Sequence, residues 1–515
     1  MVLSLDSSKA LVTGAVVVVL YLFTTRLIRY KRLSHIPGPP TTGWSSFWLV
    51  WRQAGDNIPE HFGKAIGKYG PVVRIAPNWI ICSDPDEIRR IWSVRAGWRR
   101  STWYHSFRFD PHRDNILTYP ENEDHRRART LLISAYSARG FETQERLMDE
   151  HIVRFIDLLE RKYVSDNKTS GGRYRPLDMS HVFPFLAQDV MTAVEFSKPM
   201  GLIEQDRDFL GVLGIFEKLA KVMVVTATLT WVHDLQRAPI LKPFLPKAGD
   251  GTALGRLLQL IRDHTDERYR DGPDKVWKDD MLQKMVEAGL TQEEADAEAL
   301  VALFGGTDST AVALRQTVFY LASTAPAYRA LQEEIDGEIL RGRVARPIIT
   351  DAEAKKLPFL QACLKEGTRM WAPIGGLLAK VSDKDDVICG KHIPAGTNVA
   401  WASKAVLRNR EAFGEDADVF NPQRWIDAAG DLADAERLRR MENTQGLVFG
   451  SGTRWECLGK RLAYVELGKV IFELFARFDF TMVNPENPMK TSHQSLVFHK
   501  DMFVKITKRE NPIHR

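Results

Sequence analysis

The sequence contains few cysteines and almost no excess of charge. Its four cysteines, among 515 residues, are scattered without a C-x-x-C pair or the spacing of a disulfide framework (Cys82, Cys363, Cys389, Cys457). This pattern excludes a disulfide-stapled scaffold and argues against a zinc site, so at least one cysteine is free for another role. The formal net charge is only +5, which gives no reason to expect a nucleic-acid partner.

Internal repeats, low-complexity tracts and a Rossmann fingerprint are also missing. Hydrophobic residues make up 44% of the chain and charged residues 27%, which is ordinary for a globular protein and excludes a disordered or collagen-like one. A chain of this length can bury a large core and enclose a cofactor. We expect one large body over residues 46–515, without a second domain boundary.

The N-terminus carries the longest uncharged stretch, from Ala10 to Thr25, with four valines in its middle. If Arg26 snorkels to the headgroups, the stretch extends over residues 10–28, about the length of a membrane span. Residues 1–9 precede it. The basic residues that follow are typical of a cytosolic flank, and this order is the reverse of a cleaved signal peptide. We predict a single-pass anchor; a buried helix or strand is the alternative, but no helical or strand period interrupts the valines.

A proline-rich segment, Pro37-Gly38-Pro39-Pro40, follows the basic residues. Prolines cannot continue a helix, so the anchor must end before them. We interpret residues 29–45 as a basic flank and stiff hinge between anchor and body; an ordinary surface turn is the alternative.

Helical signals dominate the body. The clearest helix runs from Thr291 to Thr324, opens with a capping box of Thr291 and Glu294, and is free of proline for about 30 residues, or about 50 Å. Its middle is nearly uncharged apart from Asp308, which is typical of an interior helix. Short strands are predicted within Val72–Cys82 and, as a hairpin, within Val387–Val399. The expected fold is mainly α with small β-sheets.

The most specific segment runs from Phe449 to Lys460 and reads F-G-S-G-T-R-W-E-C-L-G-K. Its closely spaced glycines permit a tight loop against a flat partner. Cys457 then opens a helical run, where free amides, the helix dipole and the nearby Arg454 stabilise a thiolate. A lone cysteine is more often a small buried hydrophobe, but this combination favours a functional thiolate.

This segment resembles the haem-binding loop of the cytochrome P450 family, whose pattern is F-x-x-G-x-R-x-C-x-G. Phe449, Gly452, Cys457 and Gly459 keep their places in the pattern, but one extra residue separates Arg454 from Cys457. The resemblance implies the P450 fold, an α+β fold that is mainly helical, and haem b with iron held by the Cys457 thiolate. The position of Arg454 relative to a haem propionate is the point that the extra residue leaves open.

Two further motifs resemble the same family and occur in the expected order. Glu366-Gly367-Thr368-Arg369 matches E-x-x-R, and the segment Phe420–Trp425 resembles the element whose arginine, here Arg424, completes a buried triad. Residues three apart share a helix face, so Glu366 and Arg369 can pair. Alone, this is an ordinary surface ion pair; the resemblance implies structural support of the haem site by Glu366, Arg369 and Arg424.

Gly305-Gly306-Thr307-Asp308-Ser309-Thr310 lies in the long interior helix and resembles the family's oxygen-activation motif. Each glycine costs a helix about 1 kcal/mol relative to alanine. The resemblance implies a local helix distortion, proton delivery by Asp308, and a hydroxyl next to it. The family residue after the acid is threonine; here it is Ser309, followed by Thr310, and either hydroxyl can take the role.

Cationic residues are expected at the haem propionates. His125 and Arg129, four apart on a helical run, resemble the family's propionate-binding helix, and Lys380 occupies a position where relatives carry another propionate ligand. Because Arg126 and Arg127 intervene, a solvated basic face is the competing interpretation.

The resemblance extends over essentially the whole chain after the hinge, and short similarities point to the fungal pisatin-demethylase-like branch. Segments expected around the substrate are largely apolar, which indicates a lipophilic substrate although core packing explains many of them equally well: Trp103–Phe109, Val301–Phe304, Pro373–Leu378, Ser495–Phe498. A role in secondary metabolism follows only from this branch. Asn167-Lys168-Thr169 is a glycosylation sequon that a cytosolic body leaves unmodified.

The sequence therefore predicts a haem-thiolate monooxygenase of the endoplasmic reticulum membrane with a cytosolic body. Electrons come by implication from NADPH through a separate reductase, with cytochrome b5 as a further candidate partner. Two alternatives stay open: a haem-thiolate isomerase or dehydratase without external electrons, and a membrane-tethered lipophile-binding protein without catalysis.

Overall fold

The computed structural model describes residues 3–136, 141–165, 174–271, 278–430, 434–493 and 495–509. The sequon at Asn167 lies outside these ranges. The α-helices are α1 (Leu3–Arg32), α2 (Phe47–Ala54), α3 (Ile58–Tyr69), α4 (Pro85–Trp92), α5 (Asn122–Tyr136), α6 (Phe141–Leu158), α7 (Met179–Phe196), α8 (Leu202–Gln205), α9 (Val212–Thr228), α10 (Trp231–Gln236), α11 (Ala253–Asp271), α12 (Met281–Glu287), α13 (Gln292–Ser323), α14 (Ala325–Leu340), α15 (Asp351–Ala354), α16 (Pro358–Met370), α17 (Ser403–Leu407), α18 (Arg410–Phe413), α19 (Gln423–Gly430), α20 (Ala435–Gln445) and α21 (Lys460–Arg477).

Short strands and single helical turns complete the fold. The strands are β1 (Val72–Ala76), β2 (Trp79–Cys82), β3 (Arg99–Arg100), β4 (Leu177–Asp178), β5 (Lys380–Val381), β6 (Asp386–Ile388), β7 (Lys391–Ile393), β8 (Asn398–Trp401), β9 (Phe478–Met482), β10 (Lys490–His493), β11 (Val497–Lys500) and β12 (Phe503–Lys508). The turns are η1 (Thr102–Phe107), η2 (Leu159–Tyr163), η3 (Pro239–Phe244) and η5 (Gly446–Phe449).

The sheets are small, as expected. The largest has the order β1-β2-β8-β5-β3, in which only β2 and β8 pair in parallel. The others are β4-β12-β9 and the hairpins β6-β7 and β10-β11. Within the described residues helices therefore dominate, and the prediction of a mainly α fold with small sheets is confirmed.

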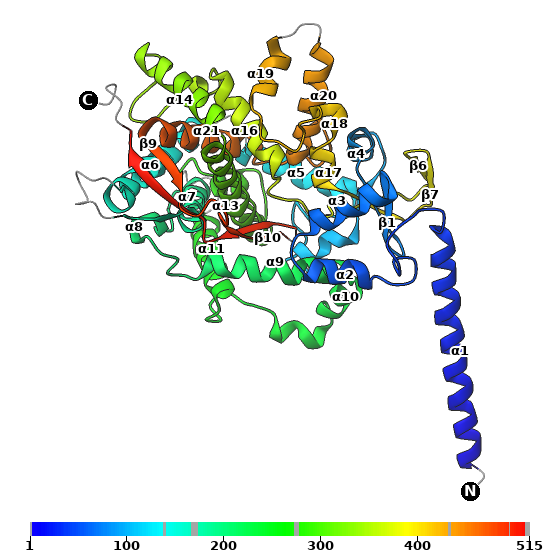
Figure 1. The fold of residues 1–515 in the computed structure, drawn as a ribbon. Coiled ribbons are helices and arrows are strands. Elements are labelled where there is room, and N and C mark those ends of the chain that lie inside the picture. Colours follow the sequence, from blue (N-terminus) through cyan, green and yellow to red (C-terminus); the bar gives the residue numbers. More distant parts are fainter. Residues whose placement is uncertain are drawn as a thin grey trace.

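Helix α13 forms the centre of the body (Figure 1), where it packs against α7, α11, α16 and α21. Its capping box is present as predicted, with the Thr291 hydroxyl accepting from the Glu294 amide. In the 18-residue stretch of α13 with the highest mean hydropathy, 72% of the residues are buried, which identifies α13 as an interior helix.

Helix α1 instead projects away from the body (Figure 1). Its segment Val12–Arg32 is long and apolar enough to cross a membrane, and none of its most apolar window is buried. The helix continues through the predicted boundary at residue 28, because the basic residues Arg29, Lys31 and Arg32 form its last turn, where cations favour the helix dipole. The chain leaves the helix before Pro37, in agreement with the proline rule.

Candidate active site

The loop before α21 presents Cys457. Gly450 and Gly452 have positive φ angles of 62° and 71°, and a Cβ on Gly450 would lie 3.1 Å from the Trp455 carbonyl oxygen, so a side chain there is strained and crowded. The Cys457 amide donates to the Phe449 carbonyl over 2.8 Å, which closes the loop. The helix itself begins only at Lys460, three residues later than the sequence indicated.

Cys457 lies beside groups that stabilise a thiolate, namely two backbone amides and an arginine. Burial raises the pKa of its thiol, whereas the backbone amides of Gly459 and Lys460 and the charge of Arg129 lower it. The side chain nevertheless has a large accessible surface. A thiol that protein atoms surround on one side can still border an enclosed space on the other. This is the geometry that a ligand to a buried metal requires.

Behind the loop, Glu366, Arg369 and Arg424 form the predicted triad, and all three are at most 3% exposed. Arg369 donates to both Glu366 carboxylate oxygens over 2.8 and 2.7 Å, and Arg424 donates over 3.0 Å. The Trp425 indole nitrogen donates to Glu366 as well, over 2.9 Å. The remaining guanidinium nitrogens donate to the backbone carbonyls of Leu407, Ala417 and Val419 and to Asp416.

Four cationic side chains and one histidine gather on the other side of Cys457, and we call these five the cationic cluster: Arg100, His125, Arg129, Lys380 and Arg454. Burial, together with the charges of the other four side chains, lowers the pKa of His125 to about 2, so its imidazole is neutral. Burial and the field of Arg100 hold the pKa of Lys380 well below its usual range. None of the five forms a salt bridge to a carboxylate in the described part of the chain, and Arg100 Nε, His125 Nδ1 and Arg454 Nε have no hydrogen-bond partner.

Arg100 and Lys380 are buried cations, and with the partly buried Arg129 and Arg454 they fit an anionic group, because an uncompensated buried charge is strongly unfavourable. The two carboxylates of a haem would supply the negative charge that these cations need. The sulfur of Cys457 would then bind the haem iron. The residues present therefore fit the cofactor that the resemblance implies.

The competing interpretation of the α5 basic run can be decided by geometry. Arg126 and Arg127 are largely exposed and pair with Glu123 and Glu294, whereas His125 is 2% exposed. Arg129 is half-buried and donates to the Glu456 carbonyl over 2.5 Å. Helix α5 thus has a solvated basic face and, on the opposite side, the two predicted residues.

Arg454 is held by the backbone around α4. Its guanidinium donates to the Val94 carbonyl and its amide to the Trp92 carbonyl. It lies near enough to lower the pKa of His125, so it joins the cluster despite the longer loop.

The oxygen-activation motif lies on α13. Asp308 is 6% exposed, its Oδ2 atom has no partner, and burial raises its pKa to about 7, against the opposing charge of Arg315. Ser309 donates its hydroxyl to the Gly305 carbonyl, and Thr310 is buried. Helix α13 is continuous through this motif, so the local distortion that the resemblance implies is not seen; the Ser309 bond back to Gly305 is compatible with an unbroken turn.

Aromatic side chains cover the approach to α13 near Gly305. Phe304 contacts Phe216 and Phe109, with ring centroids 3.6 and 4.5 Å apart. The predicted segments at 373–378 and 495–498 meet through a bridge between Ile374 and Leu496. All four predicted pocket segments thus contribute a residue to these contacts, and Trp103 of the first segment is buried in the core.

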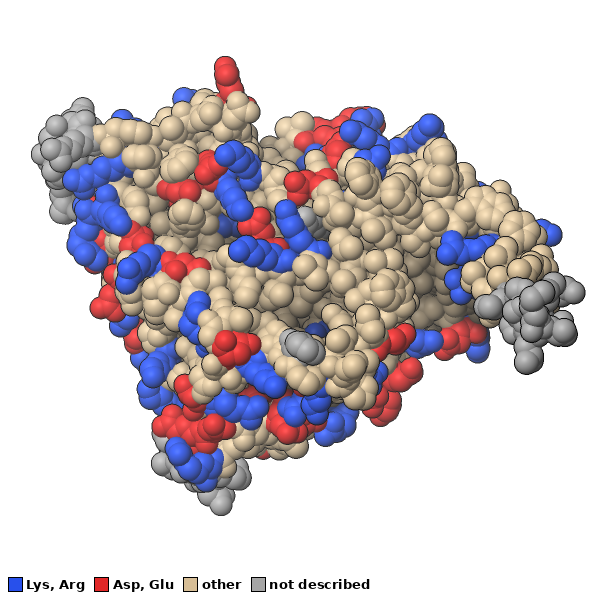
Figure 2. Space-filling model, turned by 90° about the horizontal axis from the view of Figure 1, so that it is seen from below, with Lys and Arg blue, Asp and Glu red and all other residues tan. Residues whose placement is uncertain are grey.

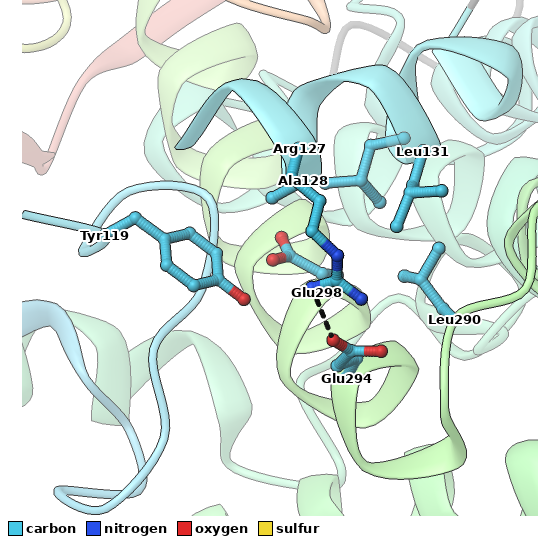
Figure 3. A pocket seen from close by; sticks show the side chains of 8 residues that line it. Tyr119, Arg127, Ala128, Leu131, Leu290, Glu294 and Glu298 are labelled. Atoms are coloured by element: carbon cyan, nitrogen blue, oxygen red, sulfur yellow. Dashed lines mark hydrogen bonds and ion pairs between the residues drawn. The ribbon is translucent and has the colours of Figure 1, made fainter. Parts of the chain in front are cut away.

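A small pocket lies between α5 and α13 (Figure 3) and is lined by Tyr119, Arg127, Ala128, Leu131, Leu132, Leu290, Glu294 and Glu298. The ion pair of Arg127 and Glu294 crosses it at 3.3 Å. Glu298, whose pKa burial raises to about 8, accepts from the Ile116 amide over 2.8 Å and lies near Arg100. None of the predicted site residues lines this pocket.

Of the cationic cluster, Arg100 is the member that the sequence did not predict. Arg100 is buried beneath Tyr104, with its guanidinium carbon 5.1 Å from the ring centroid, and it donates to the Ile116 carbonyl. Lys380 donates to the Tyr104 hydroxyl over 2.9 Å. The only signal in the sequence was a pair of arginines in a short strand, which is indistinguishable from a surface pair without the three-dimensional contacts.

Comparison with known proteins agrees with this geometry. The profile of the family described as Cytochrome P450 matches residues 37–506. The chain is 34% identical over 495 residues to the cytochrome P450 monooxygenase ABA1 of Pyricularia oryzae, covering 95% of each chain. It is 35% identical over 446 residues to aba1 of Botryotinia fuckeliana, covering 86% of this chain and 85% of the relative. It is 33% identical over 468 residues to abl1 of Leptosphaeria maculans, covering 89% and 80%. The chain belongs to the cytochrome P450 family.

Proposed function

We propose that the chain is a membrane-anchored haem-thiolate monooxygenase that inserts one oxygen atom from O2 into a lipophilic small molecule. The observation that carries the proposal is the placement of Cys457 between the amides that open α21 and the cationic cluster. The relatives, which are fungal and named as monooxygenases, support the reaction class. A substrate from fungal secondary metabolism and membership of the pisatin-demethylase-like branch are part of the proposal.

Haem b, held by Cys457 at iron and by the cationic cluster at its carboxylates, would supply the redox and oxygen chemistry. Cys457 provides the thiolate, and the amides of Gly459 and Lys460 lower the pKa of its thiol against the larger, opposing effect of burial. The triad of Glu366, Arg369 and Arg424 holds α16 and the segment before α19 in place. Its role is therefore structural, and none of the three takes part in the reaction.

Asp308 is the proposed proton donor. A carboxyl group with a pKa of about 7 is half protonated near neutral pH, which suits a group that takes up and releases protons in each turnover. Its Oδ2 atom has no protein partner, so it is free to exchange a proton through water. The hydroxyl beside Asp308 is supplied by Ser309, which bonds to the Gly305 carbonyl, with the buried Thr310 as the alternative.

Electrons are proposed to come from NADPH through a separate reductase, with cytochrome b5 as a further donor, and the body to face the cytosol from the endoplasmic reticulum membrane. The apolar helix α1 and its basic last turn support this topology. A buried acid beside two hydroxyls favours monooxygenation, which consumes protons in every turnover, over rearrangement or dehydration, which consume none overall. It equally disfavours a non-catalytic binding protein.

The proposed function is tested with purified full-length protein in lipid nanodiscs, a fungal reductase, NADPH and a panel of lipophilic substrates. We expect product only when NADPH, reductase and O2 are all present, and none with Cys457→Ala. Cys389→Ala, which removes a partly exposed cysteine outside the site, is the matched control and should retain activity. Product that forms without NADPH would instead establish an isomerase or dehydratase. Binding of the lipophilic compounds without any product, with or without NADPH, would establish a lipophile carrier.

A further inference from the structure

Two of the four cysteines, neither of them a predicted site residue, lie side by side in the structure. Cys82 is the last residue of β2 and is fully buried, whereas Cys389 is partly exposed in the turn between β6 and β7. Both side chains belong to one packed cluster, and their thiols form a hydrogen bond. The fold therefore brings together one thiol that solvent reaches and one that it does not.

The backbone on both sides of the pair is held in place. The Cys82 carbonyl accepts from the Ala402 amide over 2.8 Å. The Cys389 amide donates to the Glu87 carboxylate over 3.0 Å, and Glu87 lies in the first turn of α4, which begins three residues after Cys82. Arg90 of the same helix binds the β6-β7 hairpin with two further hydrogen bonds. Because α4 follows β2 directly and also binds the hairpin, the two thiols stay close together in the folded protein.

The conformation of Cys389 is unusual for a cysteine. Its φ angle is 47° and that of Gly390 is 72°, which is the pattern of a type I′ hairpin turn. Asparagine, aspartate and glycine are preferred there, and the left-handed conformation costs another residue about 1–2 kcal/mol. A residue that accepts such a cost is a candidate for a functional role, and here the turn places its thiol against a second thiol.

The hydrogen bond makes the two thiols unequal. It lowers the pKa of the Cys389 thiol, and together with burial it raises the pKa of the Cys82 thiol. Cys389 is therefore the thiol that ionises first, and the thiolate is the form that reacts with oxidants. An accessible thiolate beside a second, protonated thiol is the arrangement of redox-sensitive cysteine pairs, in which the second thiol resolves the oxidised first one.

The location of the hairpin gives dissolved oxidants access to Cys389. Figure 2 shows the lower face of the body, where a broad area lacks acidic and basic side chains. The hairpin lies away from that face, beside the C-terminal end of α1 (Figure 1). The exposed side chains of the hairpin and of the segment before it are mostly polar: Asp383, Lys384, Asp385 and His392. A water-soluble peroxide thus reaches Cys389 without crossing an apolar surface.

We propose that Cys389 and Cys82 form a reversible disulfide in response to a peroxide. The Cys389 thiolate attacks one oxygen of hydrogen peroxide, the O–O bond breaks, and Cys389 becomes a sulfenic acid while hydroxide leaves. The Cys82 thiol then attacks the Cys389 sulfur, so that the S–S bond forms, the S–O bond breaks and water leaves. In total the two thiols lose two electrons and two protons, and one peroxide becomes two molecules of water. A thiol reductant reverses the change.

The disulfide joins the hairpin to the strand that leads into α4. The Trp92 carbonyl at the end of this helix accepts from the Arg454 amide, and the Val94 carbonyl accepts from the Arg454 guanidinium. Oxidation therefore acts on the segment that holds Arg454. It requires neither substrate nor reductase, so the inference goes beyond the proposed function and does not rest on it.

Peptide mass spectrometry of the haem-loaded, full-length protein in nanodiscs tests the proposal. The protein is treated with hydrogen peroxide, unfolded, alkylated at its remaining thiols and digested without reductant. Trypsin leaves the two cysteines in separate peptides, residues 75–89 and 385–391. We expect these peptides to be joined, and dithiothreitol to separate them. Cys363, a fully buried cysteine on α16, is the matched control and should be alkylated in full.

Two variants assign the roles of the two thiols. In Cys82→Ala we expect dimedone to trap several-fold more sulfenic acid on Cys389 than in the parent protein, because no second thiol resolves it. In Cys389→Ala we expect the buried Cys82 to stay unmodified. Thermal unfolding of both variants checks the fold. Dimedone adducts on Cys82 in Cys389→Ala, with none on Cys389 in Cys82→Ala, would overturn the assigned roles.

The parent protein alone decides whether the pair exists. Peptides that stay separate after peroxide treatment overturn the proposal, whether Cys389 is then unmodified or oxidised to a sulfinic acid. A disulfide that joins Cys389 of two molecules overturns it as well, because Cys82 then takes no part. Monooxygenase activity enters none of these measurements, so a failure of the proposed function would be recognised separately.

Discussion

The ammonium group of Lys380 lies 4.0 Å from the centroid of the Trp455 ring. Trp455 and Glu456 stand between Arg454 and Cys457, where the family pattern has a single residue. In this longer loop Trp455 packs over the buried Lys380, and Glu456 pairs with Lys460 at 2.9 Å. The Cys457 amide donates to the Phe449 carbonyl, so the loop closes at Cys457 with the extra residue included.

This contact predicts that Lys380 helps to retain the cofactor. Replacing Lys380 with Met removes a buried cation that faces the proposed haem carboxylate site, and a charge-assisted hydrogen bond of this kind contributes about 1.5–3 kcal/mol. We expect haem transfer to an apoprotein acceptor to become about 10- to 100-fold faster. Lys384→Met, at an exposed position of the same segment, should leave the rate unchanged. Equal haem transfer rates for the two variants would show that Lys380 does not bind the haem.

The buried triad predicts a large effect on stability. Arg369→Met leaves the Glu366 carboxylate buried with one of its guanidinium partners gone, and such losses cost about 3–5 kcal/mol. The free energy of unfolding, measured with urea, should fall by this amount. Arg439→Met breaks only an exposed pair at 3.8 Å and should change it by less than about 0.5 kcal/mol. A small effect at Arg369 would show that the triad is not structural.

Much of the fold could be predicted from the sequence because it depends on local signals. The capping box of α13, the prolines after α1 and the three-residue spacing of Glu366 and Arg369 act within a few residues, and each is present in the structure. The start of α21 was placed too early because Gly459, not Cys457, is its N-terminal flanking residue.

The surroundings of the site depended on long-range packing and could not be predicted in this way. Arg100 reaches the cationic cluster only because β3 pairs with β5, which carries Lys380, almost 300 residues later in the chain. Arg74 likewise meets α1 through a hairpin strand, and no motif marks it. The absence of a distortion in α13 could not be foreseen either, because the family resemblance implied one.

Asp308 predicts a pH-dependent stability. Its pKa rises from 3.8 to about 7 on folding, so between these values the folded protein holds a proton that the unfolded chain has released. The free energy of unfolding therefore decreases as pH rises through this range, and Asp308→Asn removes that decrease. Relative to the parent protein, the variant should gain stability between about pH 4 and about pH 8, by at most about 4 kcal/mol. A difference independent of pH would contradict the assigned environment of Asp308.

The two hydroxyls next to Asp308 should differ in effect. The Ser309 hydroxyl donates to the carbonyl of Gly305, and Gly305 is exposed although most of α13 is buried. Thr310, in contrast, packs in the core. We expect Ser309→Ala to lower the amount of product formed per NADPH consumed by several-fold, and Thr310→Val to affect it little. The reverse ranking would assign the hydroxyl to Thr310.

The central claim, ligation of iron by Cys457, is tested most directly by the absorption spectrum of the reduced, carbon monoxide-bound protein. The account predicts a Soret band at the red-shifted position that thiolate ligation produces, and its loss in Cys457→Ser but not in Cys389→Ser. A band at the non-thiolate position in folded parent protein, or an unaltered band in Cys457→Ser, would contradict it.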